Sequence, residues 1–515
     1  MTKDRSRFYE LKDSGSVWLC LLSGVLTFAA FPPSRCSGLA FVSLVPWLCS
    51  LRSRKSFLSA CFVSGLFGGT FGLCVTAWLR FACSPRPNEW GQYWWAWPLL
   101  SAIIAGCYSL GGGMLWWLFR RCGLGVGFAA PLGIVCAESL LDWSVRGFAC
   151  TTADLARLGL TQADTPTFRV LAHLAGLAGV SAWVAMVNGC IVDALWRHRS
   201  TELSTWRSIS MTMASGMFVL TVAGWSSGSE SQSKHISVGI VPGPFDGHDE
   251  ALPRLARLRP QLCVWPELAC SASMTGDDLE TMLPVSRLVD CPILVGATRI
   301  AGRPLRMFNS MILVAPNGRL IEAYDKQWLG PGEEATLPIT TMWSSLRSPL
   351  FEQYSAGHEC RRIKMPGNTT FCVGICHDVC FTEWTRQVVG ETPDFVIVGA
   401  DERIDSTGRL SHLMLALTQF RAIECRRSIV RVSRPCLSGV INSQGTFVSQ
   451  SLTDQGAKVV TVPMASAPSV RWSWGPYLFW CSILFPSGWQ LLFRRASPSS
   501  AVQKQLSFST PATDG

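Results

Sequence analysis

Eight long apolar runs constrain the fold of this 515-residue chain more than any other feature of its sequence. A helix needs roughly 20 apolar residues to cross a bilayer, and most of the runs reach that length. The runs cover residues 16–31, 37–51, 57–79, 93–119, 122–143, 167–196, 208–225 and 472–493. We therefore predict a polytopic α-helical membrane domain with seven spans in residues 16–225 and an eighth span in 471–495.

Two of these runs leave the number of spans open. Run 37–51 is short for a crossing and also fits a re-entrant segment. Run 93–119 contains Gly111, Gly112 and Gly113, which we expect to interrupt its helix. The glycines of run 57–79 form overlapping GxxxG patterns, which are typical of closely packed membrane helices.

The distribution of charge indicates how the chain is oriented. Residues 236–465 hold 22 basic and 23 acidic side chains, so the formal net charge of +10 comes from the apolar parts. A nucleic-acid-binding protein concentrates positive charge on a folded face, and we therefore exclude that class. The basic residues that flank the runs lie mainly on one side, so the positive-inside rule predicts that both termini are cytoplasmic. Residues 226–470 are then expected to face outward.

The outward segment has the pattern of an α/β domain. Short β-branched runs such as ISVGIV, CPILVGA and DFVIVGA alternate with helical stretches at 277–289, 380–390 and 411–427. The tripeptides PNG and SQG are typical of hairpin turns. We expect sheets covered by helices, with two stacked sheets as one arrangement. The tails 1–15 and 496–515 are expected to be cytoplasmic, and the second to be disordered because it is rich in Ser, Pro and Gln.

Three residues in this domain have the types that an acyl-transfer site needs. Glu267 follows the apolar strand LCVW, Lys326 ends the hairpin SMILVAPNGRLIEAYDK, and Cys376 ends the apolar strand TTFCVGIC. Each lies at the end of a strand, where α/β sheets build their sites. A cysteine supplies the nucleophile, a glutamate the base, and a lysine the positive charge for the oxyanion. Taken singly, each also fits a structural role: a surface turn, a solvated hairpin end and an inert core thiol.

A metal site is the alternative interpretation of the sequence around the cysteine. Cys372, Cys376 and Cys380 are four residues apart, and His377 is adjacent. On a strand, however, a spacing of four residues separates two thiols by roughly 13 Å, which is too far for one zinc ion. The segment 236–465 has nine cysteines and no paired CxxC motifs, so we expect a free thiol and no metal or other cofactor.

The order of the three candidate residues resembles the nitrilase (carbon–nitrogen hydrolase) superfamily. Glu267, Lys326 and Cys376 are separated by 59 and 50 residues, each at a strand end. Several N-terminal spans, an outward domain and one C-terminal span resemble, within that superfamily, the apolipoprotein N-acyltransferase family along nearly the whole chain. The resemblance implies an α-β-β-α sandwich in 226–470, with Glu267 as general base, Lys326 as the oxyanion-stabilising group and Cys376 as nucleophile.

The same resemblance implies the reaction and the partners. The acyl donor is a membrane phospholipid, and the acceptor is the α-amino group of the N-terminal diacylglyceryl-cysteine of an apolipoprotein, with a cysteine thioester between them. The expected location is the bacterial cytoplasmic (inner) membrane, with the catalytic domain outside, and we expect a monomer. Two alternatives remain: a membrane-tethered nitrilase-type amidase that hydrolyses a C–N bond, and a non-enzymatic protein with a degenerate domain.

Further segments resemble the family, and some positions depart from it. The matching segments are FPPSRCSGLAFVSLVPWL, AESLLDWSVRGF and RAIECRRSIVRVS. Glu334 matches a supporting glutamate, although adjacent Glu333 fits if one gap is allowed, and Asp378 stands where the family has a supporting glutamate. His377 replaces a tyrosine, and the loop GADERIDSTG at 399–408 lacks the family's tryptophan.

The membrane part has one group of charged residues at helical spacing. Glu138, Asp142 and Arg146 fall four residues apart and share one helix face, which allows Asp142 and Arg146 to pair. The simplest interpretation is a polar helix end at the outer interface.

Overall fold

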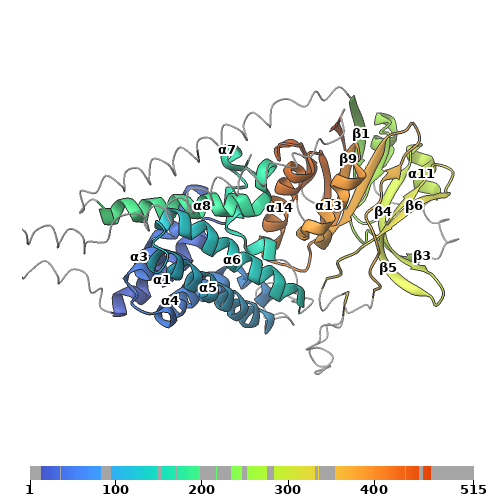
Figure 1. Cartoon of the computed structure of the whole chain (residues 1–515). Coiled ribbons are helices and arrows are strands. Elements are labelled where there is room, and N and C mark those ends of the chain that lie inside the picture. Colours follow the sequence, from blue (N-terminus) through green and yellow to red (C-terminus); the bar gives the residue numbers. More distant parts are fainter. Residues whose placement is uncertain are drawn as a thin grey trace, which may run out of the picture.

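The computed structural model describes most of the chain, and its two halves lie side by side (Figure 1). The described residues are 13–34, 36–82, 94–147, 153–169, 171–197, 216, 234–245, 252–274, 283–330, 334–335, 354–434, 437–451 and 456–465. The first half is a helical bundle and the second is an α/β sandwich. Apart from residue 216, the predicted spans at 208–225 and 472–493 lie outside these residues.

Four described helices are long and apolar enough to cross a membrane, judged by length and composition. They are α4 (Phe57–Val75), α5 (Ala96–Arg120), α6 (Val126–Gly147) and α8 (Ala172–Arg197). Helix α1 (Asp13–Ala29) is apolar but shorter. The polytopic helical domain is therefore supported by four candidate spans, and the total of eight stays a prediction.

Shorter helical pieces connect the long helices. Run 37–51 forms no single helix, because it is divided among η1, α2 and α3. The pieces are η1 (Ser37–Leu39), α2 (Ala40–Ser43), α3 (Val45–Ser53), η2 (Ala77–Phe81), η3 (Ala153–Ala156), η4 (Leu158–Gln162) and α7 (Pro166–Arg169). Whether run 37–51 crosses the membrane or re-enters it stays a prediction.

The expected interruption at Gly111, Gly112 and Gly113 is also wrong, because α5 runs through all three. A Cβ atom at Gly112 would lie 2.0 Å from Oγ of Ser64 in α4. A Cβ atom at Gly68 would likewise lie 2.6 Å from Cβ of Tyr108. The glycines therefore let α4 and α5 approach closely, and this packing offsets their low helix propensity.

The group around Glu138 differs from the prediction as well. Glu138 is only 1% exposed, so it is not a polar residue at an exposed helix end. Its carboxylate accepts a hydrogen bond from the backbone N–H of Leu158 at 2.8 Å and pairs with Arg157 at 3.4 Å. A carboxylate at this depth needs such partners because burial of an unpaired charge is costly. The side chain of Arg146 lies outside the described residues, so its pairing with Asp142 stays a prediction.

The α/β half contains two sheets in the described part of the chain. The first has the order β13-β1-β2-β4-β5-β6, with β3 beside β4, and the second has the order β12-β11-β10-β9-β8-β7. The strands of the first sheet are β1 (Lys234–Ile240), β2 (Leu262–Val264), β3 (Cys270–Met274), β4 (Ile293–Ala301), β5 (Arg306–Val314), β6 (Leu320–Asp325) and β13 (Lys458–Met464). Those of the second are β7 (Ile363–Lys364), β8 (Thr370–Ile375), β9 (Phe395–Asp401), β10 (Ile429–Arg434), β11 (Ser438–Ile441) and β12 (Phe447–Ser451).

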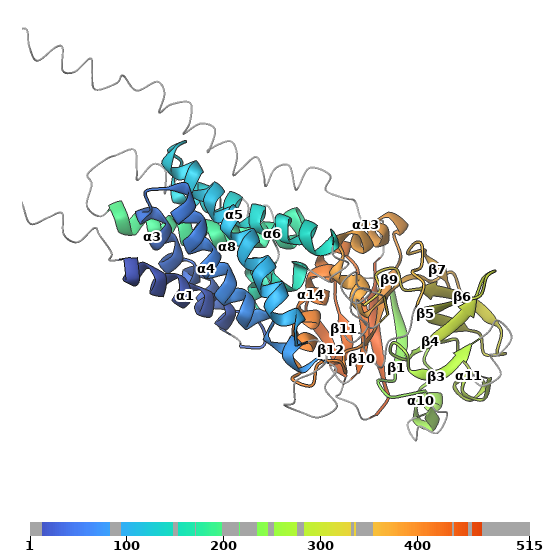
Figure 2. The ribbon, with the colours of Figure 1, turned by 90° about the horizontal axis from the view of Figure 1, so that it is seen from below.

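The two sheets are stacked, and helices cover their outer faces (Figures 1 and 2). Helices α13 (Thr382–Glu391) and α14 (Arg409–Cys425) lie between the second sheet and the helical bundle. Helices α10 (Leu252–Leu258) and α11 (Leu283–Val289) cover the first sheet on the far side. The expected helix-covered sheets are therefore observed, because strands of apolar residues bury both of their faces.

The turns and strand pairings bring the candidate residues to one edge of the sandwich. Both predicted hairpins form, since β5 pairs antiparallel with β6 and β11 pairs antiparallel with β12. Strands β8 and β9 are parallel, so their carboxyl ends lie at the same edge. Cys376 follows one of these ends and Asp401 closes the other.

Candidate active site

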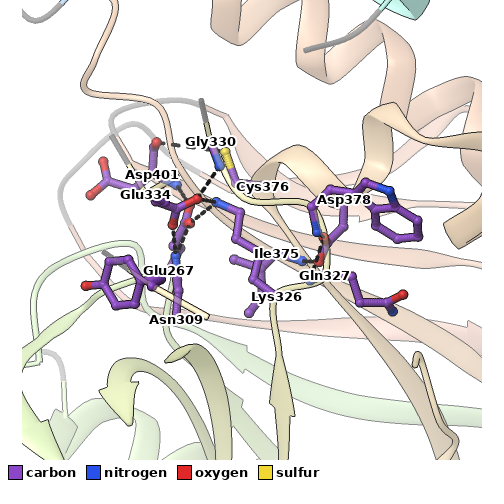
Figure 3. A network of polar contacts seen from close by, with 12 residues as sticks. Glu267, Asn309, Lys326, Gln327, Gly330, Glu334, Ile375, Cys376, Asp378 and Asp401 are labelled. Atoms are coloured by element: carbon purple, nitrogen blue, oxygen red, sulfur yellow. Dashed lines mark hydrogen bonds and ion pairs between the residues drawn. The ribbon is translucent and has the colours of Figure 1, made fainter. Parts of the chain in front are cut away.

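Glu267 is buried close to the end of β2, with an exposed fraction of 3%. Its Oε1 accepts hydrogen bonds from Nζ of Lys326 and Nδ2 of Asn309, both at 2.7 Å, and its Oε2 accepts one from the backbone N–H of Asp401 at 2.8 Å (Figure 3). Burial raises the pKa of Glu267, although the charge of Lys326 opposes the shift. Glu267 is therefore a stronger base than an ordinary carboxylate, and its interpretation as a surface-turn residue is wrong.

Lys326 follows β6 directly and is also 3% exposed. Its Nζ lies 2.7 Å from Oε1 of Glu267 and 2.8 Å from Oε2 of Glu334. Burial alone would lower the pKa of Lys326, but the two carboxylates outweigh it and raise this pKa well above its usual value. The ammonium group is therefore charged at neutral pH, and the interpretation of Lys326 as a solvated hairpin end is wrong.

Cys376 stands at the turn between β8 and the 3₁₀ helix η7 (Cys376–Cys380). Its φ of 42° is left-handed, a conformation that a side chain with a Cβ rarely adopts and that is concentrated at functional sites. The thiol is half-buried, and Sγ lies 4.0 Å from the carbonyl oxygen of Asp401. Burial and the carboxylate of Glu267 raise the pKa of the thiol well above its usual value, while Lys326 lowers it. The resting thiol therefore carries its proton and needs a base before it can attack.

Asn309 is a member of the site that the sequence did not indicate. It lies within β5, is completely buried, and donates its side-chain nitrogen to the carboxylates of both Glu267 and Glu334. Glu334 also accepts a hydrogen bond from the backbone N–H of Gly330 at 2.6 Å. A polar residue inside the apolar strand MFNSMILV was the available signal, because a buried amide requires partners.

Glu334 is the carboxylate that contacts Lys326, whereas Glu333 lies outside the described residues. Burial would raise the pKa of Glu334, but the ion pair with Lys326 lowers it below its usual value. The site therefore contains one ammonium group between two carboxylates of different basicity. The carboxylate with the raised pKa is Glu267, which is the better proton acceptor of the two.

Asp378 is completely buried in η7, two residues after the cysteine. Its Oδ2 accepts hydrogen bonds from the backbone N–H of Ile375 at 2.9 Å and from the hydroxyl of Tyr324 at 2.8 Å. Its Oδ1 accepts from the backbone N–H groups of Gln327 and Trp328 at 3.2 and 3.0 Å. Asp378 thus links the cysteine turn to the segment that follows Lys326 through hydrogen bonds. These hydrogen bonds fix the position of the turn relative to that segment.

The loop 399–408, which departs from the family pattern, is ordered and holds Glu267. Asp401 donates its backbone N–H to Glu267, and its carboxylate binds Arg434 at 2.9 Å. Arg434 in turn donates to the carbonyl oxygens of Glu267 and Leu268, both at 3.0 Å. The interactions of this loop therefore do not favour a degenerate domain.

The cysteines of the metal alternative do not lie on one helix. Cys372 lies within β8, Cys376 follows that strand, and Cys380 ends η7. Among the residues that the structure describes, no group of three or more His, Cys, Asp and Glu side chains has the arrangement of a metal site. The polar contacts of Lys326 and Asn309 with Glu267 and Glu334 are those of an acid–base site.

Comparison with known proteins identifies related chains. The N-terminal domain of the apolipoprotein N-acyltransferases matches residues 23–190. The chain is 23% identical over 473 residues to the apolipoprotein N-acyltransferase of Rhizobium leguminosarum bv. trifolii, and 22% identical over 472 residues to that of Pasteurella multocida. Both alignments cover 84% of this chain and 86% of the relative.

Among solved structures, an amidase from Nesterenkonia sp. AN1 is 17% identical with a TM-score of 0.34, covering 46% of this chain and 94% of the amidase. A CN-hydrolase superfamily protein from Xanthomonas campestris is 19% identical with a TM-score of 0.33. That match covers 49% of this chain and 96% of the CN-hydrolase protein. The resemblance noted in the sequence is confirmed by the sequence relatives: this chain carries the N-terminal domain of the apolipoprotein N-acyltransferases and is similar to members of that family along most of its length.

Proposed function

We propose that this protein transfers an acyl chain from a membrane phospholipid to the α-amino group of the N-terminal diacylglyceryl-cysteine of apolipoproteins, through a thioester on Cys376. The observation that carries the proposal is the buried ion pair of Glu267 and Lys326 beside a cysteine on a strained strand-to-helix turn. The apolar helices and the similarity to apolipoprotein N-acyltransferases indicate that the substrates are lipids.

The first half-reaction forms the acyl-enzyme. Glu267 takes the proton of the Cys376 thiol as sulfur attacks the ester carbonyl carbon, and the new C–S bond places negative charge on the carbonyl oxygen. Lys326 stabilises this oxyanion. The tetrahedral intermediate collapses, the C–O bond breaks, and the lysophospholipid leaves with the proton that Glu267 returns.

The second half-reaction transfers the acyl chain. The α-amino group of the acceptor attacks the thioester carbonyl, and Glu267 accepts a proton from the attacking nitrogen. The C–N bond forms, the C–S bond breaks, and Glu267 returns the proton to the Cys376 thiolate that leaves. Because the two substrates react in turn at one cysteine, the kinetics are ping-pong.

The location follows from the substrates, both of which are anchored in a bilayer. We place the protein in the bacterial cytoplasmic membrane as a monomer, with both termini cytoplasmic and the α/β half outside. The four candidate spans and the basic residues between the apolar runs support this arrangement. A site at the membrane surface restricts the search for lipid substrates to two dimensions.

The test is acyl-enzyme formation with an alkyne-labelled phospholipid in detergent. The parent is compared with Cys376→Ala and with Cys360→Ala, which removes another buried cysteine of the same half. We expect hydroxylamine-sensitive label on the parent and on Cys360→Ala, and none on Cys376→Ala. Equal label on all three proteins, or none on the folded parent, would contradict the proposal.

A second arm separates transfer from the amidase alternative. The labelled parent is freed of phospholipid and divided between buffer alone and buffer with a diacylglyceryl-cysteine peptide. A transferase keeps its thioester in buffer and passes the label to the peptide amine. Rapid loss of label to water in both samples would favour hydrolysis.

A further inference from the structure

Arg421 is a buried arginine in the segment RAIECRRSIVRVS, and the proposed reaction assigns it no role. It lies on α14 with an exposed fraction of 1%. Its Nε donates to the carbonyl oxygen of Val379 at 2.6 Å, and its Nη2 donates to that of Cys380 at 3.2 Å. These carbonyl groups belong to the last two residues of η7, the turn that begins with Cys376. One guanidinium group thus holds the far end of the nucleophile turn.

The same guanidinium group is paired with the helical half of the protein. Its Nη2 also forms an ion pair with Asp154 of η3, in which both side chains are almost completely buried. Asp154 pairs in turn with Arg157, which lies 3.4 Å from Glu138 in α6. Acidic and basic groups therefore alternate along a buried series from a candidate membrane span to the cysteine turn.

A second branch reaches another candidate span. Nη1 of Arg421 donates to Oε2 of Glu424 at 2.6 Å, and Oε1 of Glu424 accepts the backbone N–H of Leu177 at 2.9 Å. Leu177 follows Gly176, where a φ of 65° breaks α8 into two segments. Glu424 therefore accepts a hydrogen bond from a backbone N–H at the start of the second segment of α8, where the helix itself provides no acceptor.

The turn needs such support because its first residue is strained. The left-handed φ of Cys376 persists only where the surrounding contacts determine it. Asp378 holds the start of the turn through the backbone N–H of Ile375, and Arg421 holds its end through two carbonyl groups. Of these two side chains, Arg421 is the one anchored by ion pair to the helical half.

We infer that Arg421, anchored by Asp154 and Glu424, is a positioning residue that makes the attacking geometry of Cys376 depend on contact with the membrane helices. The inference rests on the proposed role of Cys376 as nucleophile. It differs from a purely structural role because it ties the reactivity of the cysteine, and not only the stability of the fold, to these ion pairs. A misplacement of a reacting atom by about 1 Å can cost on the order of a hundredfold in rate.

The test variant is Asp154→Asn, which keeps the side-chain shape and removes the charge that anchors Arg421. The matched control is Asp193→Asn, because Asp193 is equally buried in α8 and pairs with Arg52 at 3.1 Å within the helical half. Glu424→Gln tests the second branch and retains an acceptor for Leu177. If Asp154→Asn does not fold, Glu424→Gln is the variant on which the inference is tested.

Two rates are measured on the full chain in detergent: acyl-enzyme formation at varied phospholipid concentration, and alkylation of Cys376 by iodoacetamide. We expect Asp154→Asn and Glu424→Gln to lower the maximal acylation rate about tenfold or more, with the half-saturating phospholipid concentration unchanged. The alkylation rate should change in the same variants. Asp193→Asn should lower the melting temperature and leave both rates at the parent values.

Equal changes in the rates of Asp154→Asn and Asp193→Asn would overturn the inference, as would parent rates in folded Asp154→Asn and Glu424→Gln. The two readouts also separate this inference from the proposed function. If the parent forms no acyl-enzyme but Asp154→Asn still alters alkylation of Cys376, the proposed function fails and the positioning role stands.

Discussion

The side-chain nitrogen of Asn309 lies 2.7 Å from Oε1 of Glu267, and both side chains are almost completely buried. The same nitrogen donates to Glu334, so one amide group bridges two carboxylates that also share Lys326. A neutral donor between two acids reduces their repulsion without adding a charge. Asn309 thereby orients Glu267, the proposed general base, whose pKa is raised by burial.

Substitution of Asn309 by alanine should lower the rate of acyl-enzyme formation about tenfold or more, because a lost hydrogen bond to a charged group costs about 1.5–3 kcal/mol. The rate is followed with labelled phospholipid. Asn317→Ala is the control, since that asparagine lies exposed in the turn between β5 and β6 and accepts a hydrogen bond from the backbone N–H of Arg319. Equal rates in the two variants would show that Asn309 does not orient Glu267.

Removal of the positive charge in Lys326→Gln should reduce both activity and stability. It leaves Glu267 and Glu334 buried without their common cation, which costs about 3–5 kcal/mol in the free energy of unfolding. Arg361→Gln breaks the exposed pair with Glu359 and should cost no more than about 1 kcal/mol. Denaturant unfolding of the purified variants measures the difference. A loss of about 1 kcal/mol or less in Lys326→Gln would contradict the prediction.

Glu267→Gln should make the Cys376 thiol easier to ionise and at the same time abolish its acylation. The carboxylate of Glu267 raises the pKa of the thiol, so its removal should shift the pH profile of iodoacetamide alkylation toward lower pH. The same variant should form no acyl-enzyme, because no base remains to take the proton during attack. Glu359→Gln is the control, because that carboxylate pairs with Arg361 on the surface. An unchanged profile in Glu267→Gln would contradict the proposed proximity of base and thiol.

Substitution of His377 by phenylalanine should reduce the loss of stability in acid. Burial, together with the charge of Lys326, lowers the pKa of His377 to about 4. Between this pKa and the usual value of about 6.5, the unfolded chain binds more protons than the folded chain. The contribution of His377 to stability is therefore complete above pH 6.5 and is lost as the pH falls toward 4. Melting temperatures across this interval should fall less steeply in His377→Phe, and identical slopes in the two proteins would refute the assignment.

Local patterns account for the elements that were predicted successfully. The apolar runs at 57–79 and 122–143 indicate α4 and α6 because a bilayer-length run has few alternatives to a helix. The strand-end positions of Glu267, Lys326 and Cys376 follow from apolar segments with turn residues beside them. Their place in one site was suggested by their order along the chain and its resemblance to a family.

Predictions that depended on neighbours distant in sequence were less successful. The glycines at 111–113 were expected to break α5, yet Gly111 allows close packing against α6, and Gly112 and Gly113 allow close packing against α4. Glu138 was grouped with residues one helical turn away, whereas it pairs with Arg157, 19 residues further along the chain. Helical spacing identifies only the possible partners on the same helix.

The sequence by itself determined the candidate membrane helices and the helix-covered strands, because each depends on a short pattern of residue types. It indicated the three candidate catalytic residues through their order along the chain and the resemblance of that order to a family. The tertiary structure alone decided that Asn309 bridges Glu267 and Glu334, and that Arg421 pairs with Asp154 across 267 positions. Such contacts arise when the two sheets stack and the α/β half packs on the helices. This packing buries charged groups that would be expected to be solvent-exposed from their local sequence. Buried charges are stable only in pairs, and the fold decides which pairs can meet.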